Sequence, residues 1–421
     1  MFWRPQFKPL SIGLDLEGEG VRMLQLGISP ANELVALAAA YDATLSVRGD
    51  GAASVRELSV GLTHMLRQGR FIGKDVVVAM PREAVKHKSI RVPPMESQEL
   101  GGAMEFEAKT LFDATPDTHV IDYVPMGQVR QAGEAKQEVL VAAAPRGAVD
   151  ELVERLHHAG VRTVAVDFEP CVLYRTVERF VRRKDDEQEV HVILEVGLEG
   201  TSVLIGRGRE LCFYRPLAIG TSQIWQAIAR KLGIDKQDAQ SLSVRLGSVP
   251  EDQIDSCDDV RQAVFDASRP IVDELAREVS LCLRYATVTF RGLRPLMVRL
   301  TGLGSDDFVV RDVLSRSLPI AVEPSRPIMN ADLSRLRAAE RSGNLSAWTI
   351  ALGLALRDAP GGLAARMGVS RSGRASAPST GIDPEQAIPA EIVPGPVQPE
   401  PASTSKPAPA RVVGPSEVLS A

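Results

Sequence analysis

Two stretches of the same design constrain the fold of this chain most strongly. Each has an apolar strand, an acidic residue, a turn with two glycines and a second apolar strand: residues 11–26 (SIGLDLEGEGVRMLQL) and 190–205 (VHVILEVGLEGTSVLI). A carboxylate and free backbone amides then share one hairpin, which suits Mg-phosphate, because the carboxylate addresses the metal and the amides address phosphate oxygens. Taken alone, such a hairpin is weak evidence for this role, because most Asp-Gly hairpins are plain turns.

Two later stretches extend this pattern. Residues 296–306 (LMVRLTGLGSD) are a strand that runs into a glycine-rich turn, where Gly302 and Gly304 let the backbone approach a nucleoside closely. Residues 347–356 (AWTIALGLAL) form an apolar helix of small residues. Two acidic-glycine hairpins, then a TGxG turn and a closing small-residue helix resemble the order in the actin-like ATPase superfamily.

The composition fits a large folded protein. The chain has 421 residues, 44% of them hydrophobic, and a formal net charge of −5. That length supports two domains or more, and the mild, mixed charge gives no electrostatic reason to expect nucleic acid. The four cysteines are scattered without a CxxC pair, which fits a reduced cytosolic protein.

The sequence predicts no transmembrane segment, since no stretch reaches the roughly 18 apolar residues that a spanning helix needs. Residues 1–10 lack the continuous apolar core and the cleavage site of a signal peptide. Aromatic side chains alternate there with Arg4 and Lys8, so this segment either packs on the domain as a short arm or touches a membrane surface.

Hydrophobic periodicity divides the chain into five segments. We expect a first actin-like lobe in residues 1–85, with β-β-β-α-β order, continued in residues 145–186. Residues 86–144 form an inserted β-α-β-β subdomain, and residues 187–360 form the second lobe with a helical subdomain. Residues 361–421 are rich in Pro, Gly, Ser and Ala and are predicted to be a disordered tail.

Four further segments resemble the PilM family of type IV pilus assembly proteins, relatives of the cell-division protein FtsA. They are residues 94–107 (PMESQELGGAMEFE), 164–173 (VAVDFEPCVL), 217–239 (LAIGTSQIWQAIARKLGIDKQDA) and 275–280 (LAREVS). The resemblance implies an α/β, actin-like (ribonuclease H-like) two-lobed fold with the inserted subdomain. It implies a cytoplasmic scaffold, peripheral to the inner membrane, that binds the cytoplasmic N-terminal peptide of a PilN-like membrane protein. Contact with pilus motor components and self-association stay open.

The same resemblance implies ATP and Mg as cofactors, with Asp15 and Glu195 as the metal residues. The residues implied for cofactor binding lie on the two hairpins and the later turn: Asp15, Gly18, Gly20, Arg22, Glu195, Gly197, Gly200, Thr201, Gly302 and Gly304. Glu169 matches the position that orients the attacking water in active relatives, which makes it the candidate catalytic residue.

The sequence departs from the family at the nucleotide motifs. Arg22 stands where the superfamily has Lys, Glu17 where it usually has Gly, and Glu195 where it has Asp. Glu195 is one methylene longer than Asp, which displaces the carboxylate by more than an ångström, and a carboxylate at Glu17 would repel phosphate. Leu303 replaces a small residue. With these departures, the sequence does not decide whether ATP binds. It predicts no efficient ATP turnover and is compatible with a weak ATPase activity.

Three functions therefore compete. The first is a PilM-like scaffold of a pilus or a related type II secretion platform. The second is an active ATPase or phosphotransferase on the same fold, which needs an intact metal carboxylate and a base near the γ-phosphate. The third is an FtsA-like filament, which needs a C-terminal amphipathic helix that the Pro-rich tail lacks. Glu17 and Glu195 favour the scaffold over the enzyme.

Overall fold

The computed structural model describes residues 7–16, 18, 20–45, 52–131, 133–248, 259–290, 294–341 and 344–359. The predictions for Glu17 and for the Pro-rich tail lie outside these residues, and so does most of the predicted N-terminal arm. Within the described ranges, no helix is both long enough and apolar enough to cross a membrane.

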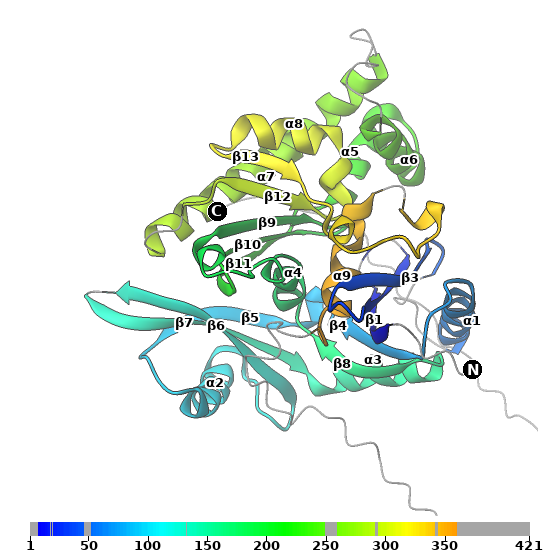
Figure 1. Ribbon diagram of the computed structural model, residues 1–421. Coiled ribbons are helices and arrows are strands. Elements are labelled where there is room, and N and C mark those ends of the chain that lie inside the picture. The colour runs from blue at the N-terminus through cyan, green and yellow to red at the C-terminus, as the bar shows by residue number, and fades with distance from the viewer. Residues whose placement is uncertain are drawn as a thin grey trace, which may run out of the picture. The chain divides into compact units, whose positions relative to one another are not determined.

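Two five-stranded sheets repeat one topology (Figure 1). In each, three antiparallel strands are followed by two strands that run parallel to the first: the orders are β3-β2-β1-β4-β8 and β11-β10-β9-β12-β13. The first sheet comprises β1 (Lys8–Asp15), β2 (Val21–Ile28), β3 (Leu34–Asp42), β4 (Asp75–Ala79) and β8 (Arg162–Asp167). The second comprises β9 (Val190–Val196), β10 (Thr201–Arg207), β11 (Glu210–Leu217), β12 (Met297–Thr301) and β13 (Ala321–Pro324).

Helices cover these sheets. They are α1 (Ala52–Gln68), α3 (Arg146–His158), α4 (Glu169–Glu178), α5 (Thr221–Leu232), α6 (Lys236–Gly247), α7 (Asp259–Thr289), α8 (Phe308–Ser317) and α9 (Thr349–Ala355). We call the first sheet with α1, α3, α4 and α9 the first lobe, and the second sheet with α5–α8 the second lobe.

The central strands of the first sheet are buried on both faces. Leu58, Leu62 and Leu156 from α1 and α3 pack on one face, and Ala351 and Leu352 from α9 pack on the other. A sheet covered on both faces requires nearly continuous apolar strands, as the run VVVA of β4 illustrates.

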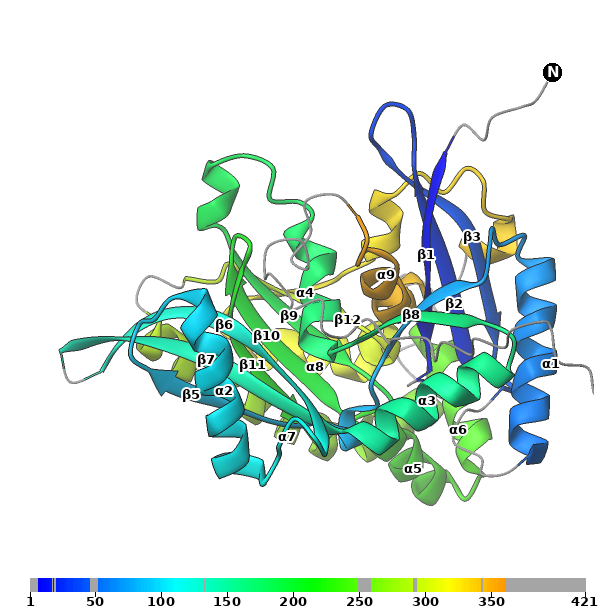
Figure 2. The same ribbon diagram turned by 90° about the horizontal axis from the view of Figure 1, so that it is seen from below.

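A third, antiparallel sheet is inserted after β4. It has the order β5-β7-β6, from β5 (Lys86–Val92), β6 (His119–Gln131) and β7 (Glu134–Pro145). Helix α2 (Ser97–Phe112) lies across one face of it, where Leu100, Met104 and Ala108 meet Val139 and Val141 (Figure 2). This unit has the β-α-β-β order predicted for the inserted subdomain.

Helix α9 lies against the first lobe although it follows the second sheet in sequence. A side chain at Gly13 would lie 2.0 Å from the carbonyl oxygen of Ala351, and one at Gly353 would lie 2.0 Å from that of Val172. These two glycines let α9 touch β1 and α4 backbone to backbone. Since Thr349 at its start bonds the hydroxyl of Thr301 on β12, α9 also connects the two lobes.

Candidate functional site in the cleft between the lobes

A cavity of about 530 Å³ opens where the two glycine hairpins face one another. This volume lies within the range of ordinary ligand sites. Both lobes contribute to its wall. The lining residues include Asp15, Gly18, Arg22, Arg82, Glu83, Glu195, Gly197, Glu199, Gly200, Gly302, Leu303, Ser346 and Thr349.

The wall from the first lobe is built on the β1–β2 hairpin. Asp15, the last residue of β1, is the cross-strand partner of Arg22 on β2, and both side chains are buried. The Arg22 guanidinium lies over the ring of Tyr41, 4.3 Å from its centre. Because Gly18 has no side chain, Arg22 extends along the hairpin turn: a Cβ on Gly18 would lie 2.8 Å from Arg22 Nη1.

The wall from the second lobe is built around Glu195, near the end of β9. Its carboxylate takes the space where two glycines lack side chains. A Cβ on Gly302 would lie 2.6 Å from Glu195 Oε1, and one on Gly197 would lie 3.3 Å from both carboxylate oxygens. Gly302 also has a φ of +86°, which other residues rarely adopt. These two glycines therefore accommodate a carboxylate one methylene longer than Asp.

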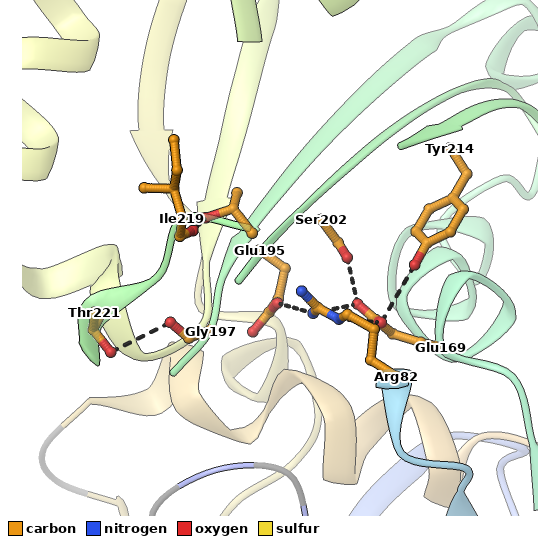
Figure 3. A network of polar contacts seen from close by, with 9 residues as sticks. Arg82, Glu169, Glu195, Gly197, Ser202, Tyr214, Ile219 and Thr221 are labelled. Atoms are coloured by element: carbon orange, nitrogen blue, oxygen red, sulfur yellow. Dashed lines mark hydrogen bonds and ion pairs between the residues drawn. The ribbon is translucent and has the colours of Figure 1, made fainter. Parts of the chain in front are cut away.

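An arginine that the sequence reasoning missed lies between the carboxylates. Arg82 is the first residue of the short 3-10 helix η1 (Arg82–Ala84), which follows β4. Its Nε and Nη2 donate to the two carboxylate oxygens of Glu169, at 2.9 and 2.8 Å, and Nη2 lies 3.5 Å from Glu195 Oε2 (Figure 3). The sequence carries a signal for it: β4 runs parallel to β1, so a polar residue just after β4 emerges at the edge that holds Asp15.

Glu169 is fully engaged by its neighbours. Besides Arg82, its carboxylate accepts a hydrogen bond from Ser202 of β10 and a longer one, 3.4 Å, from the Tyr214 hydroxyl. Its side chain is 3% exposed, and it is not among the residues that line the cavity. The predicted role of Glu169 in orienting a water stays a prediction, although these contacts occupy both of its oxygens.

The protonation of Glu195 follows from its surroundings. Burial raises the pKa of this carboxyl to about 8; Arg82 acts in the opposite direction, and the charges of Glu169 and Asp15 raise the pKa further. Glu195 therefore holds a proton at neutral pH. Arg82 donates two hydrogen bonds to Glu169, whereas Glu195 lies 3.5 Å from Nη2, so the guanidinium stabilises the ionised form of Glu195 too little to offset burial.

The structure brings seven of the predicted cofactor-binding residues to this cavity and places three elsewhere. The seven are Asp15, Gly18, Arg22, Glu195, Gly197, Gly200 and Gly302. Gly20 lines a neighbouring hollow of about 850 Å³. The Thr201 hydroxyl donates to the Ile219 carbonyl at 2.6 Å, and Gly304 packs beneath the Val196 side chain. Binding of a cofactor by any of these residues stays a prediction.

The side chains of the cleft do not suit a magnesium ion held by the protein alone. Mg²⁺ prefers six oxygen ligands, usually several waters together with one or two carboxylates and substrate phosphates. Glu169 already accepts from four donor atoms, and the Arg82 cation lies between Glu169 and Glu195. Asp15 is the remaining predicted metal residue that lines the cavity. Among the residues that the structure describes, no group of three or more His, Cys, Asp or Glu side chains is arranged to hold a metal.

The cavity is large enough for a nucleotide, and its wall holds more carboxyl groups than guanidinium groups. The carboxyl groups are Asp15, Glu83, Glu195 and Glu199, of which Glu195 has a raised pKa, and the guanidinium groups are Arg22 and Arg82. Arg82 is moreover already paired with Glu169.

Comparisons with known proteins agree with this architecture. No curated protein matches the chain significantly. The solved structure of a PilM-PilN type IV pilus biogenesis complex is similar, with a TM-score of 0.67 and 25% identity over 82% of this chain and 98% of that chain. The structure of the ethanolamine utilization protein EutJ from Carboxydothermus hydrogenoformans is less similar, with a TM-score of 0.45 at 12% identity over 84% of this chain and 90% of that one.

The predicted fold class and family resemblance are thereby confirmed. The repeated sheets, the inserted subdomain and the facing glycine hairpins are the actin-like architecture that the sequence predicted. A family model described as type IV pilus assembly protein PilM matches residues 13–359. The chain belongs to the type IV pilus assembly protein PilM family.

Proposed function

We propose that this chain is a cytoplasmic actin-like scaffold that binds the N-terminal peptide of a PilN-like inner-membrane protein. It thereby sits on the inner membrane as a peripheral part of a type IV pilus platform, or of a related secretion platform. The observation that carries this proposal is the similarity to a PilM-PilN complex, which extends over 98% of that chain. The inserted subdomain is included in the matched range of the family model.

Two free sheet edges suit an extended peptide. Strand β8 ends the first sheet and strand β6 ends the inserted sheet, so each has one side without a partner strand in its sheet. Asp122 of β6 lies near enough to Asp167 of β8 for their charges to interact. An extended segment placed between such edges gains main-chain hydrogen bonds, and alternate side chains enter pockets.

The surroundings of Asp122 favour a groove at this place. Neighbouring protein atoms raise the pKa of the Asp122 carboxyl, and the charge of Asp167 raises it further. Val120 of β6 and Val164 of β8 are 39% and 43% exposed and offer apolar anchors beside it. We place the peptide between these two strands.

The enzyme alternative has less support. An ATPase of this fold needs a carboxylate free to orient water and a metal at the phosphates. The Glu169 carboxylate is held by Arg82, Ser202 and Tyr214, and the cleft does not suit magnesium. We therefore propose a scaffold without efficient ATP turnover.

The test is fluorescence anisotropy of the labelled N-terminal peptide of a PilN-like protein. We expect saturable binding to the full chain and a loss of at least tenfold in affinity for Val164→Lys, because a charge in an apolar anchor site is costly. Val60→Lys is the matched control, since Val60 is 67% exposed on α1. Absence of binding by the wild type would overturn the proposal, and equal loss in both variants would overturn the location of the groove.

A further inference from the structure

We propose that the Arg82 side chain takes the place of a metal-bound nucleotide as the link between the two lobes. In this interpretation Arg82 is a cation built into the chain, and it holds the two lobes together without Mg²⁺ or ATP. The proposal does not depend on peptide binding, because it concerns only contacts inside the cleft.

The first step is the position of Arg82 across the cleft. It is attached to the first lobe through β4, and it is paired there with Glu169, which begins α4. From this anchored position its guanidinium reaches the second lobe. Nη2 lies 3.5 Å from Glu195, and a Cβ on Gly200 would lie 2.5 Å from Nη1.

The second step is what Arg82 occupies. Gly200 belongs to the hairpin between β9 and β10, whose backbone amides would face phosphate oxygens in a nucleotide-binding relative of this design. Arg82 lies against that turn. The guanidinium leaves no room for a side chain at Gly200. It also supplies the positive charge that stabilises the acidic side chains around it.

The third step is a second connection between the lobes beside Arg82. Ser202 on β10 of the second lobe donates to Glu169 of the first lobe, and the Tyr214 hydroxyl of β11 lies 3.4 Å from the same carboxylate. Figure 3 shows Arg82, Ser202 and Tyr214 converging on Glu169. The side chains of Glu169 and Glu195 are 3% and 8% exposed, so the carboxylate ends of the contacts are shielded from water, while the Arg82 side chain is 24% exposed to the cavity. Removing one partner of such a buried pair leaves an uncompensated charge.

A second cation has no place in this arrangement. A divalent ion bound to Glu169 or Glu195 would lie within a few ångströms of the Arg82 guanidinium and be repelled by it. Both Glu169 oxygens would also have to leave the donors that now hold them. The same carboxylates can therefore serve either the arginine or a metal.

The experiment uses the full chain and Mn²⁺ alone as the probe. Electron paramagnetic resonance measures free Mn²⁺ in the presence of wild type, Glu195→Gln and Arg82→Gln, and thermal unfolding is measured with Mn²⁺ and with a chelator. For the wild type we expect no loss of free Mn²⁺ at millimolar concentration and the same Tm in both buffers. For Arg82→Gln we expect a Tm lower by roughly 5 °C in chelator, part of which Mn²⁺ restores.

Two further variants separate this role from general destabilisation. Arg175→Gln is the matched control, because it also removes an arginine from a buried carboxylate, Asp167; we expect a lower Tm that Mn²⁺ does not restore. Arg82→Lys keeps the positive charge, and its Tm is expected to be the same with Mn²⁺ and with chelator.

Either of two results would overturn the proposal. One is Mn²⁺ binding by the wild type that Glu195→Gln abolishes, since a metal would then share the site. The Mn²⁺ comparison of wild type with Glu195→Gln tests the proposal even if Arg82→Gln does not fold. The other is an Arg82→Gln variant with an unchanged Tm in chelator. Neither result bears on peptide binding, so a failure here is distinct from a failure of the proposed function.

Discussion

Two arginine–carboxylate clusters in this molecule have opposite ratios of guanidinium groups to carboxyl groups. In the cleft, the single guanidinium of Arg82 serves two carboxyl groups, Glu169 and Glu195. At the end of β8, the single carboxylate of Asp167 serves two guanidinium groups, Arg175 at 2.7 Å and Arg357 at 2.8 Å. The first cluster joins the two lobes, whereas the second lies within the first lobe.

The difference shows how charge ratio decides whether a buried cluster responds to pH. Burial alone would raise the pKa of Asp167, yet its two arginines outweigh that effect and the pKa is lowered. In the cleft, burial and the neighbouring carboxylates together outweigh Arg82, and the pKa of Glu195 rises to about 8. The Asp167 carboxylate therefore stays ionised except in acidic solution, whereas Glu195 in the Arg82 cluster has its pKa raised to about 8.

The largest expected effect is the pH dependence of stability set by Glu195. Its pKa in the folded state is raised from 4.5 to about 8, so its contribution to stability is complete below pH 4.5 and is lost as the pH rises through 8. The shift corresponds to at most about 5 kcal/mol. We expect Glu195→Gln to match the wild type at pH 5 and to be the more stable protein at pH 9, measured by urea unfolding. Glu134→Gln is the control, because its side chain is 72% exposed.

Parallel pH profiles of wild type and Glu195→Gln would contradict this account of the cleft. The Asp167 cluster is expected to behave in the opposite sense. Because the folded-state pKa of Asp167 is lowered, its contribution is present above its ordinary pKa of 3.8 and is lost only in more acidic solution.

The next effect is the loss of the Asp167 carboxylate. Asp167→Asn leaves two buried guanidinium groups without their anion, and we expect a loss of about 3–5 kcal/mol in the free energy of unfolding at pH 7. Asp75→Asn is the matched control: Asp75 pairs with Arg162 on the surface, with side chains 41% and 73% exposed, and this pair contributes less than about 1 kcal/mol. Equal losses in the two variants would show that the buried cluster has no special role.

A smaller effect is expected where a glycine makes room for Glu195. Gly302→Ala introduces a side chain at a φ of +86°, 2.6 Å from both Glu195 Oε1 and the Val196 carbonyl oxygen, and should cost about 2 kcal/mol in chemical denaturation. Gly160→Ala is the control that measures the stability cost of a side chain at positive φ alone, since Gly160 has a φ of +87° and no atom within 4 Å of the added Cβ. If both variants lose the same stability, the contact between Gly302 and the Glu195 carboxylate is unimportant.

The smallest effect concerns the outer part of the cleft cluster. Tyr214→Phe removes the 3.4 Å hydrogen bond to Glu169 and should lower the free energy of unfolding by about 0.5–1 kcal/mol. Ser202→Ala removes a hydrogen bond from a fully buried hydroxyl to the same carboxylate and is expected to have the larger effect. The reverse order, measured by urea unfolding of both variants, would contradict the bond pattern described for Glu169.

The sequence predicted the fold and the position of the cleft because both depend on local patterns. The apolar runs around Asp15 and Glu195 and the glycines after them fix the two hairpins, and the repeated sheet topology brings them face to face. Gly302 was assigned to a nucleoside, but its missing side chain also leaves room for Glu195.

What the sequence reasoning missed depends on contacts between distant residues. Arg82 follows β4 and meets Glu169 and Glu195 only after the sheets are assembled, so no spacing along the chain indicates the pairing. Thr201 was expected at the cofactor because it follows a glycine hairpin, but its hydroxyl points to Ile219, whose carbonyl is contributed by the next loop. In both cases, tertiary partners decide the role of a residue whose local motif is ambiguous.

The central claim is that this chain is a scaffold that binds its partner peptide, and that Arg82 links its two lobes across the cleft. The most direct measurement is isothermal titration of the PilN-like N-terminal peptide into the full chain, once with chelator and once with Mg-ATP. The account predicts the same affinity in both buffers, and no heat when Mg-ATP alone is titrated into the protein. Peptide binding that occurs only with Mg-ATP would contradict it.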